Sequence, residues 1–181
     1  GVDAVYVITS DLDAMAIARA RGASILPEQE QQSESYSVDA ASRTLAQQGV
    51  EAVLTIPADI PAVHTGDITA VLLEATSDRA VVMVPSQDEQ GTNAIWRRPP
   101  QAILSRFGVD SFRKHLAEAE AHGLHWGVVR VPRLAMDIDQ PEDLAAFLTF
   151  PGQTRTRALL EELRVTDRLA AGSQSGISLV G

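Results

Sequence analysis

The hydrophobic residues of this chain fall into short runs that alternate with segments of helical spacing. Runs of apolar and β-branched residues predict strands at 5–9, 23–26, 52–56, 80–84, 94–96, 126–131 and 135–138. Apolar residues three and four positions apart predict helices at 12–20, 37–48, 65–75, 111–122 and 141–150, with Ser37 as the N-cap of the second. This alternation favours right-handed crossovers and a mostly parallel α/β sheet with helices on both faces. Ligands of such sheets gather at the carboxyl ends of the strands.

The pattern changes at Pro151, where a proline and a glycine end the alternation. We therefore assign residues 1–150 to one domain. Residues 154–170 have the spacing of an amphipathic helix, and the Gly- and Ser-rich residues after them are typical of a flexible tail. Residues 151–181 are accordingly predicted to form a C-terminal helix and a tail.

Composition and charge exclude several classes of partner. A chain of 181 residues, 45% of them hydrophobic, can bury one core and is short for two ordinary domains. The net charge of -9 opposes nucleic acid and anionic membranes as partners, because the average field repels phosphate groups. Cysteine is absent, which fits a reducing cytoplasm, and no apolar run approaches the ~20 residues of a membrane span. A phosphate ligand therefore needs local help from arginines, backbone N–H groups or a metal ion.

Three aspartates are candidates for metal binding at the carboxyl edge of the predicted sheet. Asp59 directly follows the strand at 52–56, although a turn aspartate near a proline is the alternative. On a strand, Asp137 and Asp139 point to one face, and two like charges side by side are unfavourable unless water, a proton or a cation intervenes. Helix capping by Asp139, with Glu142 three residues later, is the alternative for Asp139 but leaves Asp137 unexplained.

Two glycine-containing segments are candidates for anion binding. The segment GTNA at 91–94 opens a predicted strand, and FGVDS at 107–111 leads into a predicted helix. A glycine approach to a helix N-terminus offers unpaired N–H groups that suit phosphate or carboxylate, whereas Ser111 as an ordinary N-cap is the alternative. The sequence contains no nucleophile elbow, Walker A loop or G-x-G-x-x-G segment. Serine-hydrolase, P-loop and dinucleotide-binding functions therefore have no support.

Taken in order, five segments resemble the 2-phospho-L-lactate guanylyltransferase family, which includes phosphoenolpyruvate and 3-phosphoglycerate guanylyltransferases of coenzyme F-420 biosynthesis. The segments are VITSD at 7–11, PADIP at 57–61, GTNA at 91–94, FGVDSF at 107–112 and DIDQPEDL at 137–144. The likeness covers roughly residues 4–148, and the ordered set is more specific than any one segment. It implies a Rossmann-like, GT-A-like nucleotidyltransferase fold, a three-layer sandwich with a mostly parallel sheet.

The resemblance implies a reaction in which GMP passes from GTP to a phosphorylated three-carbon acid, with release of pyrophosphate. By similarity, three aspartates are the catalytic residues that hold Mg²⁺: Asp59, Asp137 and Asp139. By the same similarity, three residues bind the phospho-acid: Thr92, Gly108 and Ser111. The chemistry suits such a site, because the attacking phosphate oxygen is already anionic and needs alignment and charge neutralisation rather than a protein nucleophile.

Two features depart from the family. Asp39 stands where the family usually has an asparagine linked to nucleotide recognition, so Asp39 is the candidate nucleotide-binding residue and the preference for GTP is open. The family's first strand and its basic triphosphate-binding loop are expected before Gly1. The identity of the phospho-acid and the choice between monomer and homodimer are open as well. The alternatives are a nucleotidyltransferase of the molybdenum-cofactor or sugar-nucleotide type and a non-catalytic phospho-acid-binding relative.

We predict that residues 1–181 alone do not catalyse guanylyl transfer. A triphosphate brings up to about four negative charges to a site with three aspartates, which Mg²⁺ alone does not balance. The nearest basic residues, Arg97 and Arg98, stand beside two prolines and are interpreted as a surface turn. The measurement is pyrophosphate release with GTP, Mg²⁺ and each phospho-acid, by this chain and by a form extended at its N-terminus. Equal turnover would place the whole triphosphate site within residues 1–181.

Overall fold

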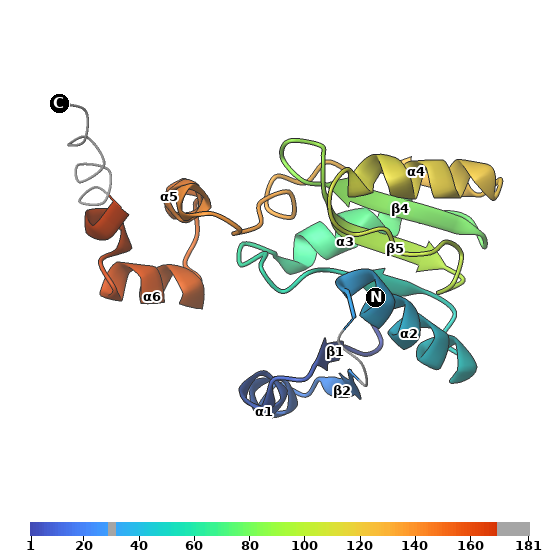
Figure 1. The fold of residues 1–181 in the computed structure, drawn as a ribbon, viewed down its shortest axis with the longest axis horizontal. Helices are drawn as coiled ribbons and strands as arrows, with labels where there is room; N and C mark the ends of the chain where they lie inside the picture. The colour runs from blue at the N-terminus through green and yellow to red at the C-terminus, as the bar shows by residue number, and fades with distance from the viewer. Residues whose placement is uncertain (29–31, 170–181) are drawn as a thin grey trace.

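The computed structural model describes residues 1–28 and 32–169, which form an α/β protein with two sheets (Figure 1). The larger sheet has four strands in the order β3-β5-β4-β6. Their bounds are Val53–Thr55 for β3, Ala80–Pro85 for β4, Thr92–Arg98 for β5 and His125–Val128 for β6. The smaller sheet is a parallel pair, β1 (Tyr6–Thr9) and β2 (Ser24–Pro27).

The larger sheet is mixed, so the prediction of a mostly parallel sheet is confirmed only in part: β3, β4 and β6 share one direction and β5 is reversed. Strand β5 runs antiparallel to both β3 and β4, while β4 and β6 are parallel. The reason is the connection from β4 to β5: residues 86–91 are too few for the crossover that parallel neighbours need, so the two strands close as a hairpin. Consequently the carboxyl ends of β3, β4 and β6 and the start of β5 lie at the same edge of the sheet.

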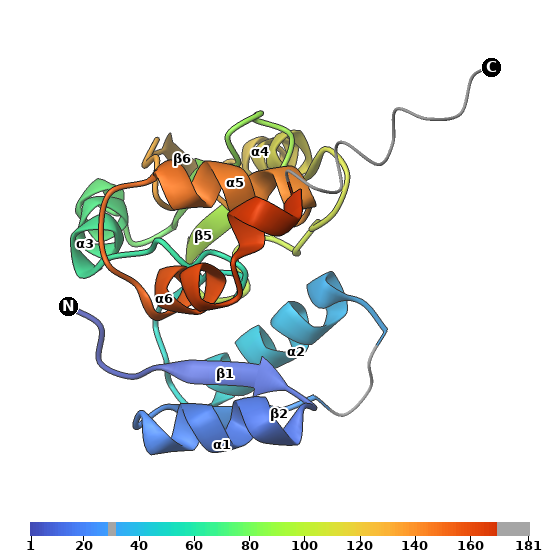
Figure 2. The same ribbon diagram turned by 90° about the vertical axis from the view of Figure 1, so that its left-hand side faces the viewer.

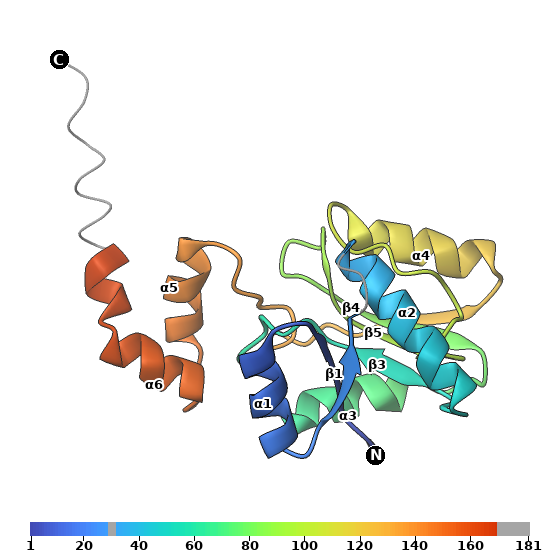
Figure 3. The same cartoon turned by 60° about the horizontal axis from the view of Figure 1, so that its bottom comes forward.

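Helices cover both faces of the larger sheet, because side chains alternate along its buried central strands. On one face, Val71 of α3 belongs to a core cluster with Val82 of β4. On the other face, Phe112 of α4 belongs to a cluster with Met83 of β4. Helix α2 lies over β3 and β5, as Figure 3 shows. The bounds are Glu34–Gln47 for α2, Thr65–Glu74 for α3 and Ser111–Ala121 for α4.

The β1–β2 pair has its own helix, α1 (Leu12–Ala20), which packs along it in Figure 2. Asp11 caps α1 by accepting a hydrogen bond of 2.7 Å from the Ala14 N–H. Helix α2 follows β2 and begins earlier than predicted. Its N-cap is Ser33, whose hydroxyl accepts from the Tyr36 N–H at 3.2 Å, so the prediction of Ser37 as N-cap is wrong.

The segment before α5 is extended but is not a strand, so the strand predicted at 135–138 is wrong. It forms isolated backbone hydrogen bonds with two different loops rather than a ladder, through Ala135 and Ile138. The helix cap is also displaced by one residue. Asp143 accepts from the N–H groups of Asp139 (3.0 Å) and Gln140 (2.8 Å), so Gln140 rather than Asp139 is the N-cap.

Helices α5 (Pro141–Thr149) and α6 (Arg155–Glu162) pack together beside the larger sheet (Figure 1). Their cluster is centred on Met136, Phe147 and Leu160. The single helix predicted at 154–170 is interrupted after Glu162, and a further helical turn covers 165–169. The predicted tail at 170–181 lies outside the described residues. No helix in the described ranges is long and apolar enough to cross a membrane.

Asp67 joins α3 to the segment that leads towards α5. Its buried carboxylate accepts from the His64 N–H at 2.8 Å and from Arg133 at 2.6 and 2.8 Å. Burial alone raises the pKa of Asp67, but the hydrogen bonds from Arg133 and His64 and their positive charges outweigh it and hold the pKa below the ordinary 3.8. The ionised carboxylate therefore stabilises the folded state.

We predict that Asp67→Asn lowers the free energy of unfolding at neutral pH by about 2 kcal/mol, because it removes hydrogen bonds to a charged group. A carboxylate with a lowered folded pKa contributes its full stability above its unfolded pKa and loses it as the pH falls through the folded pKa. The difference between wild type and variant should therefore shrink as the pH falls below 3.8. Urea unfolding over a pH series measures this, and a difference independent of pH would indicate a packing defect instead.

Candidate functional site

Four acidic side chains gather at the edge of the sheet where β3 ends. Asp59 follows β3, while Asp137 and Asp139 lie on the extended segment before α5. The two segments are joined directly, because the Ile138 N–H donates to the Asp59 carbonyl at 3.1 Å. The fourth member is Glu34, in the first turn of α2. The structure thus brings the three predicted aspartates together and adds Glu34, which lies before the helix predicted at 37–48.

Burial and repulsion between carboxylates raise the pKa values of two members of this cluster, Asp59 and Glu34. Partial burial raises the pKa of Asp59, a backbone hydrogen bond opposes that rise, and the charges of Asp139 and Asp137 raise the pKa further. Partial burial likewise raises the pKa of Glu34, and the charges of Asp59 and Asp139 add to the effect. Burial and the neighbouring carboxylates therefore both make ionisation of Asp59 and Glu34 harder.

Among the described residues, no basic side chain balances the four carboxylates. Within residues 1–28 and 32–169, none of them forms an ion pair with Arg, Lys or His. In the same part of the chain, no three His, Cys, Asp or Glu side chains are placed as a ready-made metal site. The cluster therefore has the donor chemistry of a site for a hard cation, but its side chains are not arranged around one.

A second polar cluster lies at the start of β5 and of α4. Thr92 Oγ1 is 2.9 Å from His115 Nδ1 and 3.4 Å from Ser111 Oγ, and all three side chains are buried. The N-cap of α4 is Asp110, in the left-handed region at φ 58, so the interpretation of Ser111 as N-cap is wrong. Ser111 is instead the first helical residue, and its hydroxyl lies against Thr92.

Gly108 forms the turn before α4. Its φ of 102 favours glycine, and its carbonyl accepts from the Ser111 N–H at 3.1 Å. The next N–H, of Phe112, donates to the Gln90 carbonyl at 3.3 Å. These two N–H groups at the start of the helix are therefore already used within the protein. The polar groups that this end of α4 can offer include the hydroxyls of Thr92 and Ser111.

His115 connects this cluster to the loop before α4. Burial lowers the pKa of His115 to about 4, and the nearby charge of Arg97 acts in the same direction. The imidazole is therefore neutral at physiological pH. The sequence analysis did not single out His115. Its position four residues after Ser111, on the same side of the helix, was the signal that was available.

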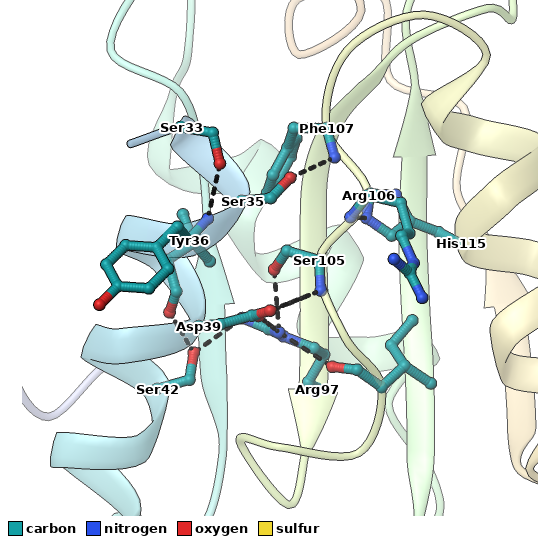
Figure 4. Close-up of polar contacts among 12 residues, drawn as sticks. Ser33, Ser35, Tyr36, Asp39, Ser42, Arg97, Ser105, Arg106, Phe107 and His115 are labelled. Atoms are coloured by element: carbon teal, nitrogen blue, oxygen red, sulfur yellow. Dashed lines mark hydrogen bonds and ion pairs between the residues drawn. The ribbon is translucent and has the colours of Figure 1, made fainter. Parts of the chain in front are cut away.

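A buried ion pair holds α2 against β5 (Figure 4). Arg97 is completely buried, so its interpretation as part of a surface turn is wrong. Its guanidinium lies 3.3 Å from Asp39 and donates to Ser42 Oγ at 2.8 Å. It also donates to the Ile103 carbonyl and to Ser105 Oγ, both at 3.2 Å. Strand β5 is thereby tied to a helix that is distant in sequence and to the loop that follows the strand.

Asp39 is the acidic partner in this network. Its two carboxylate oxygens accept from the Ser105 N–H at 3.0 and 3.2 Å, besides the contact with Arg97. Both oxygens are thus engaged within the protein. Because these oxygens already have partners, the geometry gives no support to a contact between Asp39 and a nucleotide. A role of Asp39 in nucleotide binding stays a prediction.

The loop between β5 and α4 is fixed by side chains from both helices. Three consecutive backbone N–H groups, those of residues 105–107, each donate to a side chain (Figure 4). The acceptors are Asp39 at 3.0 Å, His115 Nε2 at 2.7 Å and Ser35 Oγ at 2.9 Å. The segment that leads to Gly108 is therefore seated between α2 and α4.

Comparison with known proteins gives a consistent result. A family model described as "Guanylyl transferase CofC like" matches residues 1–179. The phosphoenolpyruvate guanylyltransferase of Conexibacter woesei is 32% identical over 173 residues, which cover 92% of this chain and 78% of that protein. The 2-phospho-L-lactate guanylyltransferase of Methanothermobacter thermautotrophicus is 32% identical over 172 residues, with coverage of 95% and 75%.

A solved structure shares the fold. The chain is similar to a protein from Desulfovibrio desulfuricans G20 that is assigned as a nucleotide-diphospho-sugar transferase, with a TM-score of 0.68. The likeness covers 92% of this chain and 76% of that one. The sequence identity is 16%, so this comparison shows the fold alone.

We predict that Asp39→Ala lowers the free energy of unfolding by about 3–5 kcal/mol, because it leaves the buried Arg97 without its counter-charge. Urea unfolding measures the loss. The matched control is Arg98→Ala, since Arg98 is partly exposed and pairs with Glu51 and Asp78 at the surface. Loss of such pairs changes stability by at most about 1 kcal/mol. Equal effects of the two variants would contradict the structural role of the buried pair.

Proposed function

The chain belongs to the CofC-like guanylyl transferase family, and on this basis we propose that it transfers GMP from GTP to a phosphorylated three-carbon acid, with release of pyrophosphate, in coenzyme F-420 biosynthesis. The two relatives described above are named for phosphoenolpyruvate and 2-phospho-L-lactate. Both acceptors combine a phosphate with a carboxylate on a three-carbon unit. We propose phosphoenolpyruvate as the first acceptor to test, because several of the similar proteins are named for it.

One observation carries the proposal: the two polar clusters lie at the same edge of the larger sheet. The acidic cluster (Glu34, Asp59, Asp137 and Asp139) includes Asp59, beyond the end of β3. The hydroxyl cluster (Thr92, Ser111 and His115) includes Thr92, at the start of the neighbouring strand β5. Transfer between two substrates requires that both be held side by side in a fixed orientation. Neighbouring strands of one sheet provide that, since their ends are fixed by the ladder.

The acidic cluster fits a divalent cation by its donor chemistry. Asp59, Asp137 and Asp139 offer carboxylate oxygens, which Mg²⁺ prefers, and no basic side chain in the described part of the chain neutralises them. Bound there, Mg²⁺ supplies charge neutralisation at the phosphoryl group that is transferred. The three aspartates would hold the cation in place. The adjacent Glu34 adds to the negative potential that favours a cation.

The hydroxyl cluster is proposed to bind the acceptor. Thr92 and Ser111 place two hydroxyl groups 3.4 Å apart, and Gly108 forms the turn that leads to Ser111. Hydroxyl groups can donate hydrogen bonds to phosphate or carboxylate oxygens. The acceptor phosphate is ionised at neutral pH, so the residues around it have to align it rather than remove a proton.

Activity with a panel of substrates tests this proposal. We expect pyrophosphate release from GTP and Mg²⁺ with phosphoenolpyruvate, 2-phospho-L-lactate or 3-phosphoglycerate, measured with the N-terminally extended form. Asp139→Asn should reduce kcat by about 100-fold or more, since loss of a metal ligand removes several kcal/mol of stabilisation. The stability of the metal-free variant should not fall, because the substitution removes one of several like charges.

Glu142→Gln is the matched control for that variant. Glu142 is an exposed acidic residue in the first turn of α5, outside the acidic cluster, so its activity should stay near the wild-type value. Full activity of Asp139→Asn would contradict the metal site. No pyrophosphate release by either form with any acceptor would contradict the proposed function.

A further inference from the structure

His115 is a buried polar side chain that the proposed reaction does not yet use. Its imidazole is completely buried between the start of β5 and the loop before α4. The ring of Phe107 packs against it edge-on, with ring centroids 5.2 Å apart. An apolar side chain could fill such a position without the cost of removing a polar ring from water. The presence of a histidine here therefore calls for an explanation in terms of its hydrogen bonds.

The hydrogen bonds of His115 fix which ring nitrogen carries the proton. The Arg106 backbone N–H donates to Nε2 at 2.7 Å, and a backbone N–H can act only as a donor. Nε2 is therefore unprotonated. The neutral ring then carries its proton on Nδ1, which lies 2.9 Å from Thr92 Oγ1. His115 consequently donates a hydrogen bond to Thr92.

This donation determines what the Thr92 hydroxyl can do. A hydroxyl has two lone pairs and one proton, and the Nδ1–H of His115 occupies one lone pair. The Ser111 hydroxyl lies 3.4 Å away and is placed to donate to the same oxygen. The proton of Thr92 is then directed away from His115. Ionised phosphate and carboxylate oxygens accept hydrogen bonds and do not donate them. A Thr92 hydroxyl held in this way keeps its proton for donation, which is what an anionic ligand requires.

We propose that His115 is a positioning residue for the acceptor: through its Nδ1–H it holds the Thr92 hydroxyl as a donor towards the phospho-acid, and through Nε2 it seats the 105–107 loop beside that site. This inference rests on the proposed function, because it takes the phospho-acid to bind at Thr92. It assigns to His115 an effect on acceptor affinity that is separable from its effect on folding.

Two substitutions separate the two hydrogen bonds of His115. His115→Asn places an amide N–H near the position of Nδ1 and keeps the donor to Thr92, but it loses the acceptor for the Arg106 N–H. His115→Gln reaches the position of Nε2 and keeps that acceptor, but it loses the donor. Calorimetry with phosphoenolpyruvate and Mg²⁺ gives the Kd of the acceptor, and calorimetry with GTP gives that of the nucleotide.

We expect His115→Gln to weaken phosphoenolpyruvate binding about tenfold, the size of one hydrogen bond to a charged group, with GTP binding unchanged. His115→Asn should retain most of the affinity. Thr92→Val should also weaken acceptor binding, and adding His115→Gln to it should cause no further loss, because both act on one interaction. His122→Gln, at an exposed histidine of the same helix, is the matched control and should bind like the wild type. The imidazole ¹⁵N shifts of the wild type should show a neutral ring with its proton on Nδ1 at neutral pH.

The outcomes distinguish the inference from the function on which it rests. Equal losses in His115→Gln and His115→Asn, equal effects on both substrates, or additive effects with Thr92→Val would show a purely structural role for His115 and leave the proposed function standing. A ring protonated on Nε2 would overturn the inference as well. If the wild type binds GTP but none of the three phospho-acids, in either form of the chain, the acceptor assignment and the inference both fail.

Discussion

A guanidinium that is completely removed from water must find its counter-charge and its hydrogen-bond partners within the protein. The two terminal nitrogens of Arg97 find them on α2, in Asp39 and Ser42, and on the loop after β5, in Ile103 and Ser105, whereas its Nε has no partner in the described part of the chain. The contacts with α2 join segments that are far apart in sequence. The contacts with Ile103 and Ser105 hold the loop that turns away from the sheet after β5. The net stability of such a pair is small, but removing one partner is strongly unfavourable, so the pair restricts how α2 and the loop can sit on β5.

Both polar clusters depend on that restriction. Helix α2 carries Glu34 in its first turn, where it contributes to the acidic cluster, and Asp39 further along, where it meets Arg97. The loop fixed by Asp39 continues to Gly108 and reaches His115 through the Arg106 N–H. One buried ion pair therefore positions a helix that contributes to the acidic cluster and a loop that contributes to the hydroxyl cluster. This is a physical reason why the two clusters keep a fixed separation.

The two clusters differ in how their polar groups are balanced. In the hydroxyl cluster, burial is accompanied by hydrogen bonds that link Thr92, Ser111 and His115. In the acidic cluster, burial and then the neighbouring carboxylates raise the pKa values of Asp59 and Glu34, and within the described ranges no basic side chain pairs with these carboxylates. Unbalanced charge of this kind is unfavourable for folding and favourable for binding a cation. The hydroxyl cluster thus contributes to the stability of the fold, while the acidic cluster is held together by backbone contacts such as that between Ile138 and Asp59.

The sequence by itself determined most helices and strands, the α/β class, the family, and the position of Asp59 shortly after a strand, because periodicity and punctuation are local properties of the chain. The tertiary structure decided what depends on contacts between distant segments. It made β5 antiparallel, since the short 86–91 connection allows a hairpin alone, and it moved the helix caps to Ser33, Asp110 and Gln140. It buried Arg97, which two adjacent prolines had made look exposed, and turned His115 inward to Thr92. Local pattern does not show which charged side chain has a partner 58 positions away in the chain, and burial of a charge depends on that partner.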